Sequence, residues 1–311
     1  MRAVKPPRVT VGVPTFNRAG SLPRALDSVL AQGYAELELL IADNASTDAT
    51  PKVCADYAAR DHRVRIMRHP RNIGLTGNFN ALLAAAAGEL VMVLADDDWL
   101  EPTYVEHCLA ALDADPGLVV ASGGARFHGV AGTPVAGVEL DLLDDDPARR
   151  VGRYFAGVAD NVTIYGLMRR AALMPLLPMQ NRLAGDWLLC GRLAMTGRIR
   201  TVGSTWVNRS VSGTSSSYAG TVRAMGLTAR EERHPHLAIA GFVYVDIAHD
   251  GAVYEPLGPF RRRALAATCA MAVLQRRPLN VVEDALRPLL RRARMQRLDR
   301  ALRPLARRLQ R

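Results

Sequence analysis

The sequence predicts an α/β protein in which helices flank a mostly parallel sheet, with a helical extension at the C-terminus. Over roughly the first 120 residues, short apolar segments alternate with amphipathic segments of helical period. The apolar segments mostly lack the polar–apolar alternation of a strand with one exposed face. Strands of this kind, spaced by helices, form parallel sheets that are covered on both faces.

Five strands and four helices are expected in this first part of the chain. Ser21, with Pro23 close behind it, is typical of a helix start, and Gly88 is typical of a helix end. The expected strands are 9–14, 37–42, 64–67, 90–95 and 118–122, and the expected helices are 21–30, 47–60, 75–87 and 102–113.

Beyond residue 125 the pattern is looser. Gly and Pro indicate loops around 129–147, and the Ser-, Gly- and Thr-rich residues 209–221 indicate a mobile loop. We expect a strand at 161–170, helices at 171–177 and 186–196, and helical structure from about 225 onward. The chain is therefore expected to divide into three parts, which are 1–125, 126–222 and 223–311.

Composition excludes several classes of protein. The 311 residues are 49% hydrophobic and 23% charged, which is typical of a globular protein. The longest apolar stretches reach about a dozen residues, short of the roughly 20 that span a bilayer, and no signal peptide is expected. Four widely spaced cysteines without a CxxC pair predict neither a disulfide scaffold nor a zinc ribbon. These features favour a cytoplasmic protein.

The positive charge is concentrated at the C-terminus. Residues 286–311 hold ten Arg and one Asp, a net charge of +9, whereas the whole chain carries +10. Leu and Ala recur there at mostly three- and four-residue steps, so a basic amphipathic helix is predicted, with a break at Pro304. Such a helix can lie on an anionic membrane, here the inner face, or present a solvated face on the protein surface. Nucleic-acid binding is not expected, because interleaved aromatic residues are missing.

Polar side chains follow three of the expected strands. They are Thr-Phe-Asn-Arg at 15–18, Asp-Asn-Ala-Ser at 43–46 and Asp-Asp-Asp at 96–98. Ligands of parallel sheets bind at the carboxyl ends of the strands. Three adjacent carboxylates repel one another unless a divalent cation such as Mg²⁺ or Mn²⁺ lies between them. The alternative is a solvated acidic turn leading into the next helix.

Four segments in order resemble glycosyltransferase family 2, the nucleotide-sugar-dependent enzymes of the GT-A fold. They are Val-Pro-Thr-Phe-Asn-Arg at 13–18, Asp-Asn-Ala-Ser-Thr-Asp at 43–48, Asn-Ile-Gly at 72–74 with Asn80 and Gly-Glu at 88–89, and Asp-Asp-Asp-Trp-Leu-Glu-Pro at 96–102. The resemblance is strong over the first 125 residues and weaker to about residue 210. It implies that 1–125 bind the nucleotide-sugar and that 126–222 bind the acceptor, with 223–311 as an extension.

The resemblance also implies roles for single residues. Nucleotide-sugar binding falls to Pro14, Thr15 and Phe16 around the nucleobase and ribose, to Asp43 as acceptor from the base, to Asp96 at the ribose or phosphate, and to Asn72 and Asn80. Asp97 is implied as the most direct ligand of Mn²⁺ or Mg²⁺, with Asp98 close by. One departure is that Asn78 and Phe79 replace the family's Ala-Arg, so Arg18 or Arg71 is expected to supply the missing cation.

In the second half, Asp186 matches the family's catalytic base. It follows Gly185 at the start of an expected helix, about 90 residues after the acidic motif. The alternative is that Asp186 only caps that helix. His234 and His236 are weaker candidates for a metal ligand, since two histidines that flank a proline more often belong to a surface loop.

The function implied is inverting sugar transfer from a UDP-, GDP- or dTDP-sugar to a sugar, lipid-linked or small-molecule acceptor. No Gln-x-x-Arg-Trp motif is present, which favours the transfer of single sugars over polymer synthesis. Two alternatives stay open. One is a nucleotidyltransferase, although the Gly-rich loop of those enzymes is missing after the first strand. The other is a non-catalytic nucleotide-sugar-binding protein at a membrane.

Overall fold

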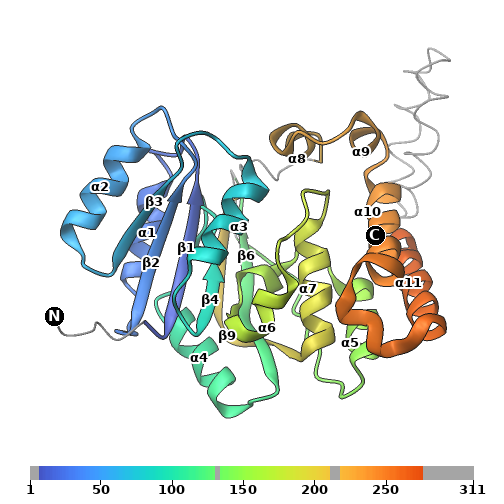
Figure 1. Cartoon of the computed structure of the whole chain (residues 1–311). Helices are drawn as coiled ribbons and strands as arrows, with labels where there is room; N and C mark the ends of the chain where they lie inside the picture. Colours follow the sequence, from blue (N-terminus) through green and yellow to red (C-terminus); the bar gives the residue numbers. More distant parts are fainter. Residues whose placement is uncertain (1–6, 130–133, 211–217, 276–311) are drawn as a thin grey trace.

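The computed structural model describes residues 7–129, 134–210 and 218–275, and in these ranges the chain forms one nine-stranded sheet with helices on both faces (Figure 1). The strand order is β3-β2-β1-β4-β8-β6-β9-β5, and β7 pairs with β6. The strands are β1 (Val9–Thr15), β2 (Leu37–Asp43), β3 (Val64–Arg68), β4 (Leu90–Val93), β5 (Trp99–Leu100), β6 (Leu118–His128), β7 (Val135–Ala136), β8 (Leu167–Arg169) and β9 (Arg198–Ser210).

The mostly parallel sheet predicted from the sequence is confirmed. β1 pairs in parallel with β2 and β4, and β2 pairs in parallel with β3. β8 runs antiparallel to both of its neighbours, β4 and β6, while β6 and β9 are parallel again. Because the short β8 enters between β4 and β6, the second half of the chain completes the sheet begun by the first half.

Helices cover both faces of this sheet and enclose two hydrophobic cores. In β2, Leu39 and Ile41 belong to one core, whereas Leu40 and Ala42 belong to the other. This double burial explains why the strand lacks polar alternation. The helices are α1 (Leu22–Leu30), α2 (Thr50–Arg60), α3 (Leu75–Ala85), α4 (Tyr104–Ala114), α5 (Pro147–Gly157), α6 (Arg170–Leu173), α7 (Gly185–Thr196), α8 (Tyr218–Met225), α9 (Ala229–Arg233), α10 (Pro235–Val245) and α11 (Gly258–Gln275).

Close contact between α3 and the sheet depends on a glycine in β1. A Cβ placed on Gly12 would lie 2.2 Å from a side-chain carbon of Leu82 on α3. Leu82 is fully buried there. The glycine therefore allows the helix to pack directly on the strand that leads to the Thr15 end of the sheet.

Several expectations for the second half were wrong. Residues 161–170 do not form one strand, because Asn161 has a left-handed backbone (φ 47°) that interrupts an extended chain. A 3₁₀ turn, η1 (Val162–Tyr165), follows instead and leads into β8. Three elements, α5, β7 and β9, were not predicted at all, and β6 extends to His128. Within the expected loop 209–221, Arg209 and Ser210 end β9, residues 211–217 lie outside the described ranges, and α8 begins at Tyr218.

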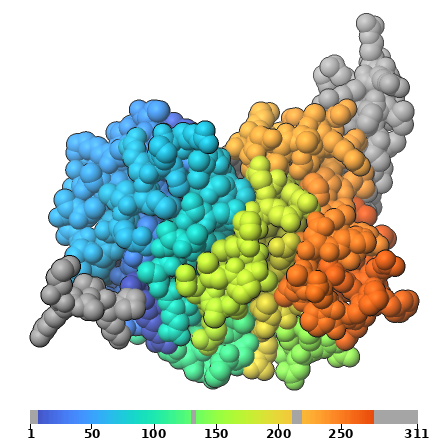
Figure 2. Space-filling view, viewed as in Figure 1, coloured from blue at the N-terminus to red at the C-terminus, as the bar shows by residue number. Residues whose placement is uncertain are grey.

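The C-terminal helices α10 and α11 pack beside α5 and α7, at the end of the molecule opposite α2, β2 and β3 (Figures 1 and 2). A buried ion pair between Arg192 of α7 and Asp246 joins these helices to α7. No single helix in the described ranges is long and apolar enough to cross a membrane. One bent pair, Pro235–Asp250 with Ala252–Gln275, meets the length and composition test only when its two members are taken together. The predicted amphipathic helix at 286–311 lies outside the described residues.

Candidate functional site

A cleft of about 460 Å³ lies at the carboxyl ends of β1 and β4, where sheets of this type bind ligands. Its lining comes from the ends of these strands and the loops after them, from the segment that leads into α3 and α3 itself, and from η1 and α8. The lining residues are Pro14, Thr15, Phe16, Arg18, Asn44, Asn72, Gly74, Leu75, Asn78, Phe79, Val93, Ala95, Asp96, Asp97, Ile164, Tyr165, Thr221, Ala224 and Met225.

The loop after β1 is held in place by the loop after β2. Asn17 adopts a left-handed backbone (φ 54°), and its side-chain oxygen accepts a hydrogen bond from the Thr47 backbone N–H at 2.8 Å. In return, the Asn17 N–H donates to Ser46 Oγ at 2.9 Å, and Ser46 N–H donates to Asp43 Oδ1 at 3.0 Å. Phe16 and Arg18, on either side of Asn17, are thereby directed to the cleft by a fixed turn.

The adjacent wall of the cleft is formed by the side chains of Asn44 and Asn72 and by the backbone that follows Asn72. Asn44 Nδ2 donates to Asn72 Oδ1 at 2.9 Å, and Asn44 Oδ1 accepts from the Ile73 N–H at 2.9 Å. Asn72 Oδ1 also accepts from the Gly74 N–H at 2.8 Å. Gly74 precedes α3 with φ 79°, a conformation that favours glycine. The Asn-Ile-Gly segment is therefore a wall of the cleft that Asn44 holds in place.

The three consecutive aspartates have different surroundings. Asp96 lines the cleft, and burial raises its pKa to about 6 although the guanidinium Nε of Arg18 lies 3.6 Å away. Asp97 also lines the cleft, and no hydrogen bond to its carboxylate is found within the described residues. Asp98 is buried, and each of its carboxylate oxygens accepts a hydrogen bond. Among the three aspartates, Asp97 therefore presents to the cleft a carboxylate that no described residue binds.

Asp98 connects the acidic motif to the second half of the chain. Its Oδ2 accepts from the hydroxyl of Tyr165 at 2.6 Å, and its Oδ1 accepts from the Ser210 N–H at 2.8 Å. Arg209 Nε lies 3.7 Å from Oδ2, and the Arg209 guanidinium packs over the Tyr165 ring at 4.9 Å. Burial raises the pKa of Asp98 above the ordinary value, and the Tyr165 hydrogen bond opposes that shift. Arg209 was not singled out from the sequence.

Asp186 lies in the first turn of α7 and does not cap it. The N-cap position belongs to Ala184, so the capping alternative was wrong. Asp186 Oδ2 accepts a hydrogen bond of 2.6 Å from Asn161 Nδ2, and Asn161 Oδ1 accepts from the Tyr154 hydroxyl at 2.8 Å. Burial raises the pKa of Asp186 above the ordinary value. Asp186 is outside the cleft lining, and Asn161 connects it to η1, which carries the lining residue Tyr165.

The structure brings six of the predicted donor-binding residues to the cleft and leaves three outside its lining. Those at the cleft are Pro14, Thr15, Phe16, Arg18, Asn72 and Asp96. Arg71 is exposed elsewhere, which favours Arg18 as the replacement cation. Asn80 instead exchanges two hydrogen bonds of 2.8 Å with the backbone of Met179. Asp43 is buried beside Asn44, and its Oδ2 lies 3.3 Å from Arg68 Nη1.

The two histidines do not reach the cleft. His236 is buried in the first turn of α10, and His234 is the residue before that helix. Within the described ranges, no group of three or more His, Cys, Asp or Glu side chains is arranged to hold a metal ion. The structure therefore gives no support to a ligand role for His234 or His236. All four cysteines are free and buried.

Comparison with known proteins decides the family. A family model described as glycosyl transferase family 2 matches residues 10–176, which is more than half of the chain. This protein belongs to glycosyltransferase family 2. The match includes the strands and turns that form most of the cleft, and it ends before Asp186.

Relatives in this family share mainly the N-terminal part. EpsH of Bacillus subtilis is 27% identical over 167 residues, which are 54% of this chain and 48% of EpsH. Glycosyltransferase GlyA of Streptococcus pneumoniae is 34% identical over 99 residues, which are 32% of this chain and 14% of GlyA. The aligned part of the chain thus spans about half the length of EpsH and much less of GlyA.

Solved structures with the same fold extend over nearly the whole chain. TarS 1–349 of S. aureus, in complex with UDP, superimposes with a TM-score of 0.56 at 17% identity and covers 87% of this chain and 91% of that one. The mannosyltransferase PcManGT from Pyrobaculum calidifontis, in complex with GDP-Man and Mn²⁺, gives 0.54 at 20% identity and covers 88% and 75%. These likenesses establish the GT-A fold for this family 2 member.

The residues at the cleft fit a divalent cation bound together with a substrate. The open carboxylate of Asp97 and the neighbouring Asp96 are hard oxygen donors. Mg²⁺ typically takes one or two carboxylates and completes its shell with phosphate oxygens and waters. Asp98 is already engaged by Tyr165 and Ser210, so the structure favours Asp97 and Asp96 as the protein ligands.

Proposed function

We propose that this protein transfers a single sugar from a nucleoside-diphosphate donor to an acceptor hydroxyl with inversion at the anomeric carbon. The observation that carries the proposal is the unpaired carboxylate of Asp97, which faces a cleft whose other walls are the family's nucleotide-sugar motifs. The donor would bind to residues 1–125 and the acceptor to residues 126–222, and residues 223–311 would form a helical extension. The missing Gln-x-x-Arg-Trp motif supports non-processive transfer.

Donor binding would use polar groups that the protein itself leaves available. Thr15 lines the cleft with a buried hydroxyl close to Asp96. Asp43 Oδ2 is buried and lies 3.3 Å from Arg68 Nη1, so a base would share this oxygen with the guanidinium. Phe16 is 41% exposed and offers a ring face at the cleft. A ligand with hydroxyl or N–H donors and a planar base suits such a surface.

Mn²⁺ or Mg²⁺ held by Asp97 and Asp96 would, when bound, offset the charge of the departing nucleoside diphosphate. Arg18 would add a positive charge on the same side, since its guanidinium lies 3.6 Å from Asp96. Together these residues would favour the release of the diphosphate over its retention on the sugar.

Asp186 would take the proton from the acceptor hydroxyl as that oxygen attacks the anomeric carbon. Asn161 Nδ2 donates to Oδ2, and the backbone N–H groups of Asp186 and Trp187 also act on the carboxylate, so its plane is fixed. A raised pKa makes the carboxylate a stronger base, which suits proton abstraction near neutral pH. The carboxylate is thus held in a fixed orientation toward the acceptor side of the fold.

The nucleotide and the sugar are best tested by direct binding. Thermal-shift measurements against UDP-, GDP- and dTDP-sugars with Mn²⁺ should identify one donor that raises the melting temperature, because a ligand of the folded state stabilises it. TarS was solved with UDP and with UDP-GlcNAc, and PcManGT with GDP-Man and Mn²⁺, which supports a panel of this composition. The acceptor panel would contain sugars, lipid-linked sugars and small molecules.

Product analysis then tests the reaction itself. Free nucleoside diphosphate together with a glycosylated acceptor is the expected outcome. Release of pyrophosphate would mean nucleotidyl transfer and would refute the proposal. Donor binding without turnover across the acceptor panel, by a protein with intact Asp97 and Asp186, would also refute it.

For the basic segment 286–311, we propose peripheral contact with an anionic membrane at the inner face. Its net charge of +9 over 26 residues supports this, because each Arg near such a surface contributes about 1 kcal/mol. Full-length protein should sediment with anionic vesicles, and replacement of the ten arginines by glutamine should weaken this binding severalfold or more. Unchanged sedimentation of that variant would exclude the segment as the contact.

A further inference from the structure

α11 has two apolar faces, and the protein core covers only one of them. The covered face carries Leu265, Ala266, Cys269 and Val273. The opposite face is exposed, with Phe260 at 87% and Met271 at 52% of their accessible surface, and with Ala264 and Ala267 exposed between them. A surface helix normally places polar residues on the side facing water. The exposed apolar face of α11 therefore needs an explanation other than core packing.

These four side chains form a straight strip. They are spaced by four, three and four residues, which is the repeat that keeps side chains on one side of a helix. At about 100° and 1.5 Å per residue, Met271 lies within roughly 20° of Phe260 and about 16 Å further along the axis. We refer to Phe260, Ala264, Ala267 and Met271 as the α11 strip.

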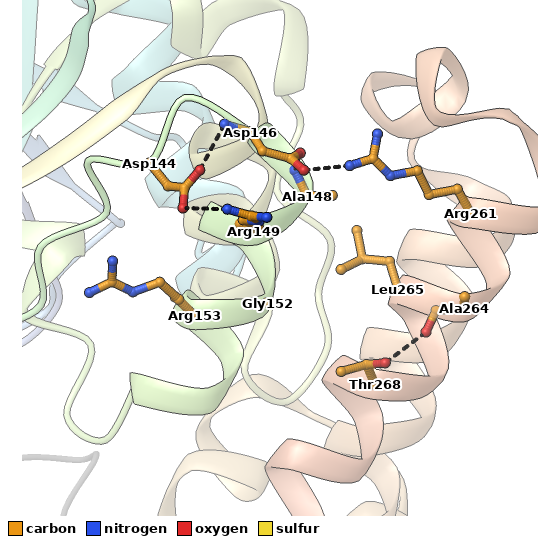
Figure 3. Close-up of a pocket in the computed structure, with 10 residues that line it drawn as sticks. All are labelled: Asp144, Asp146, Ala148, Arg149, Gly152, Arg153, Arg261, Ala264, Leu265 and Thr268. Atoms are coloured by element: carbon orange, nitrogen blue, oxygen red, sulfur yellow. Dashed lines mark hydrogen bonds and ion pairs between the residues drawn. The ribbon is translucent and has the colours of Figure 1, made fainter.

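A groove of about 480 Å³ continues the strip toward α5 (Figure 3). Its α11 wall carries Ala264, Leu265 and Thr268, and its α5 wall carries Ala148 and Gly152. Arginine side chains lie around its edge, namely Arg149, Arg153 and Arg261. The groove lies at the end of α5 away from Asn161, so it is separate from the site around Asp186.

The charges beside the strip are predominantly positive. α11 contains three Arg and no acidic residue, and the exposed Arg263 lies next to the strip. Three aspartates near the groove are each close to an arginine: Asp146 Oδ2 to Arg261 at 2.5 Å, Asp144 to Arg149 at 3.8 Å and Asp145 to Arg198 at 3.6 Å. Apolar side chains bordered by arginine are typical of helices that lie in a membrane interface.

We propose that the α11 strip and its arginine border dock onto the surface of an anionic lipid bilayer, with Phe260 and Met271 entering the headgroup region. This contact is independent of the sugar-transfer proposal and is separate from the contact proposed for 286–311. Arg263 and Arg261 would lie among lipid phosphates while the strip replaces water with acyl chain. α11 would then lie parallel to the membrane surface.

A second copy of the chain fits this face less well. Pairing two α11 strips would bring Arg261 and Arg263 of both copies together, and like charges in contact oppose association. A strip about 16 Å long also offers much less area than the roughly 1,200–2,000 Å² of a stable interface. The segment 286–311 is an equally poor occupant, since its own charge is +9.

The contact can be measured separately from any contribution of the basic segment. Phe260→Trp in the full-length chain should be quenched by vesicles of brominated phosphatidylcholine containing about one-third phosphatidylglycerol. The matched control is Val135→Trp, because Val135 is 67% exposed and belongs to β7, which pairs with β6 and is no part of the α11 strip. We expect clear quenching above the wild-type level for the Trp at 260 and none above it for the Trp at 135. Equal quenching of the two would overturn the proposal.

A loss-of-contact variant gives a second readout. Phe260→Ser with Met271→Ser should lower partition into these vesicles about tenfold, as expected when two large apolar side chains no longer leave water, whereas Val135→Ser should not change it. Light scattering should show the same mass for the wild-type chain and for the double variant, without a dimer that depends on the strip. Such a dimer would overturn the proposal in favour of a second copy. Glutamine at the ten arginines of 286–311 should reduce total sedimentation and leave the quenching of vesicle-bound protein unchanged.

Discussion

The adjacent residues Asp97 and Asp98 should respond oppositely when each is replaced by Asn. The Asp97 carboxylate lines the cleft and has no hydrogen-bond partner in the described structure, so its replacement removes a ligand-binding group without disturbing a protein contact. Asp98 is buried and accepts from Tyr165 and Ser210, so its replacement disturbs the protein itself. We expect Asp97→Asn to be stable and inactive and Asp98→Asn to be destabilised.

The size of the stability difference follows from the contacts of Asp98. In Asp98→Asn, Arg209 loses the anion it faces, although its side chain is only 17% exposed. Breaking a buried ion pair costs about 3–5 kcal/mol, and the lower end applies because Arg209 also donates to the Asp160 carbonyl at 2.7 Å. An unfolding entropy of roughly 2.1 cal/mol/K per residue over 311 residues converts about 3 kcal/mol into a fall of about 5 °C in melting temperature.

Two assays distinguish the roles of these carboxylates. Scanning calorimetry should show a melting temperature within about 1 °C of the wild type for Asp97→Asn, and about 5 °C lower for Asp98→Asn. Transfer, followed as released nucleoside diphosphate, should fall about 10²–10³-fold in Asp97→Asn, as when one group that stabilises developing charge is removed. Metal-dependent donor binding should be lost in that variant only. If Asp98→Asn kept its stability and lost metal-dependent binding, Asp98 would be a ligand and this reasoning would be wrong.

Four further predictions follow from the structure. Asp186→Asn should lower the rate of transfer about 10²–10⁴-fold. Its melting temperature should stay equal or rise, because a buried charge is removed. A loss of donor binding as large as the loss of transfer would contradict the role of Asp186 as base. The kcat–pH profile should fall on the acid side at a pH above the ordinary range of Asp, because Asp186 must be deprotonated to act, and the residual activity of Asp186→Asn should lack this limb. Gly12→Ala should cost about 1–3 kcal/mol, measured by denaturant unfolding, because its Cβ would lie 2.2 Å from Leu82; an unchanged midpoint would show that Leu82 moves freely. Asn80→Ala should lose about 1–3 kcal/mol of stability, because its two hydrogen bonds to Met179 are removed. Donor affinity, measured by calorimetric titration, should not change. Weaker donor binding at unchanged stability would show that Asn80 does bind the donor.

The first half of the fold could be predicted because its strands are buried on both faces. Leu39, Leu40, Ile41 and Ala42 are all fully buried, and such a run leaves little choice besides a central strand. The polar residues that end each strand then marked the cleft, since chain topology alone brings the carboxyl ends of parallel strands to one edge.

The second half was less predictable because its elements depend on partners that are distant in sequence. β9 contains Arg198, Arg200 and Ser204, and it becomes a strand because β6 offers it a parallel neighbour. Such pairing leaves little local signal. The break at Asn161 follows from one left-handed residue, a conformation that Asn accepts more readily than most residues but does not require.

The site residues that were missed share a cause. Arg209 and Tyr165 matter because they meet Asp98 in space, at sequence separations of more than 60 residues. Asn80 was assigned to donor binding on its position in a motif, whereas its amide pairs with the Met179 backbone. A sequence motif shows which residues occur together. Their contacts in the folded chain show which of them face the ligand and which hold the loops in place.

Three carboxyls of the site have pKa values raised by burial, and this has a consequence for stability. A carboxyl whose pKa is higher in the folded state than in the unfolded chain stabilises the fold at low pH, and that contribution is lost as the pH rises through the folded value. For Asp96 this loss occurs at a pH of about 6, and Asp98 and Asp186 act in the same direction. Near neutral pH the site therefore holds these charges at a cost to folding. Arg18 and Arg209 offset part of it within the protein. A bound cation at Asp96 and Asp97 would relieve more of the cost, so burial of these carboxyls strengthens the attraction of the site for a metal with a diphosphate.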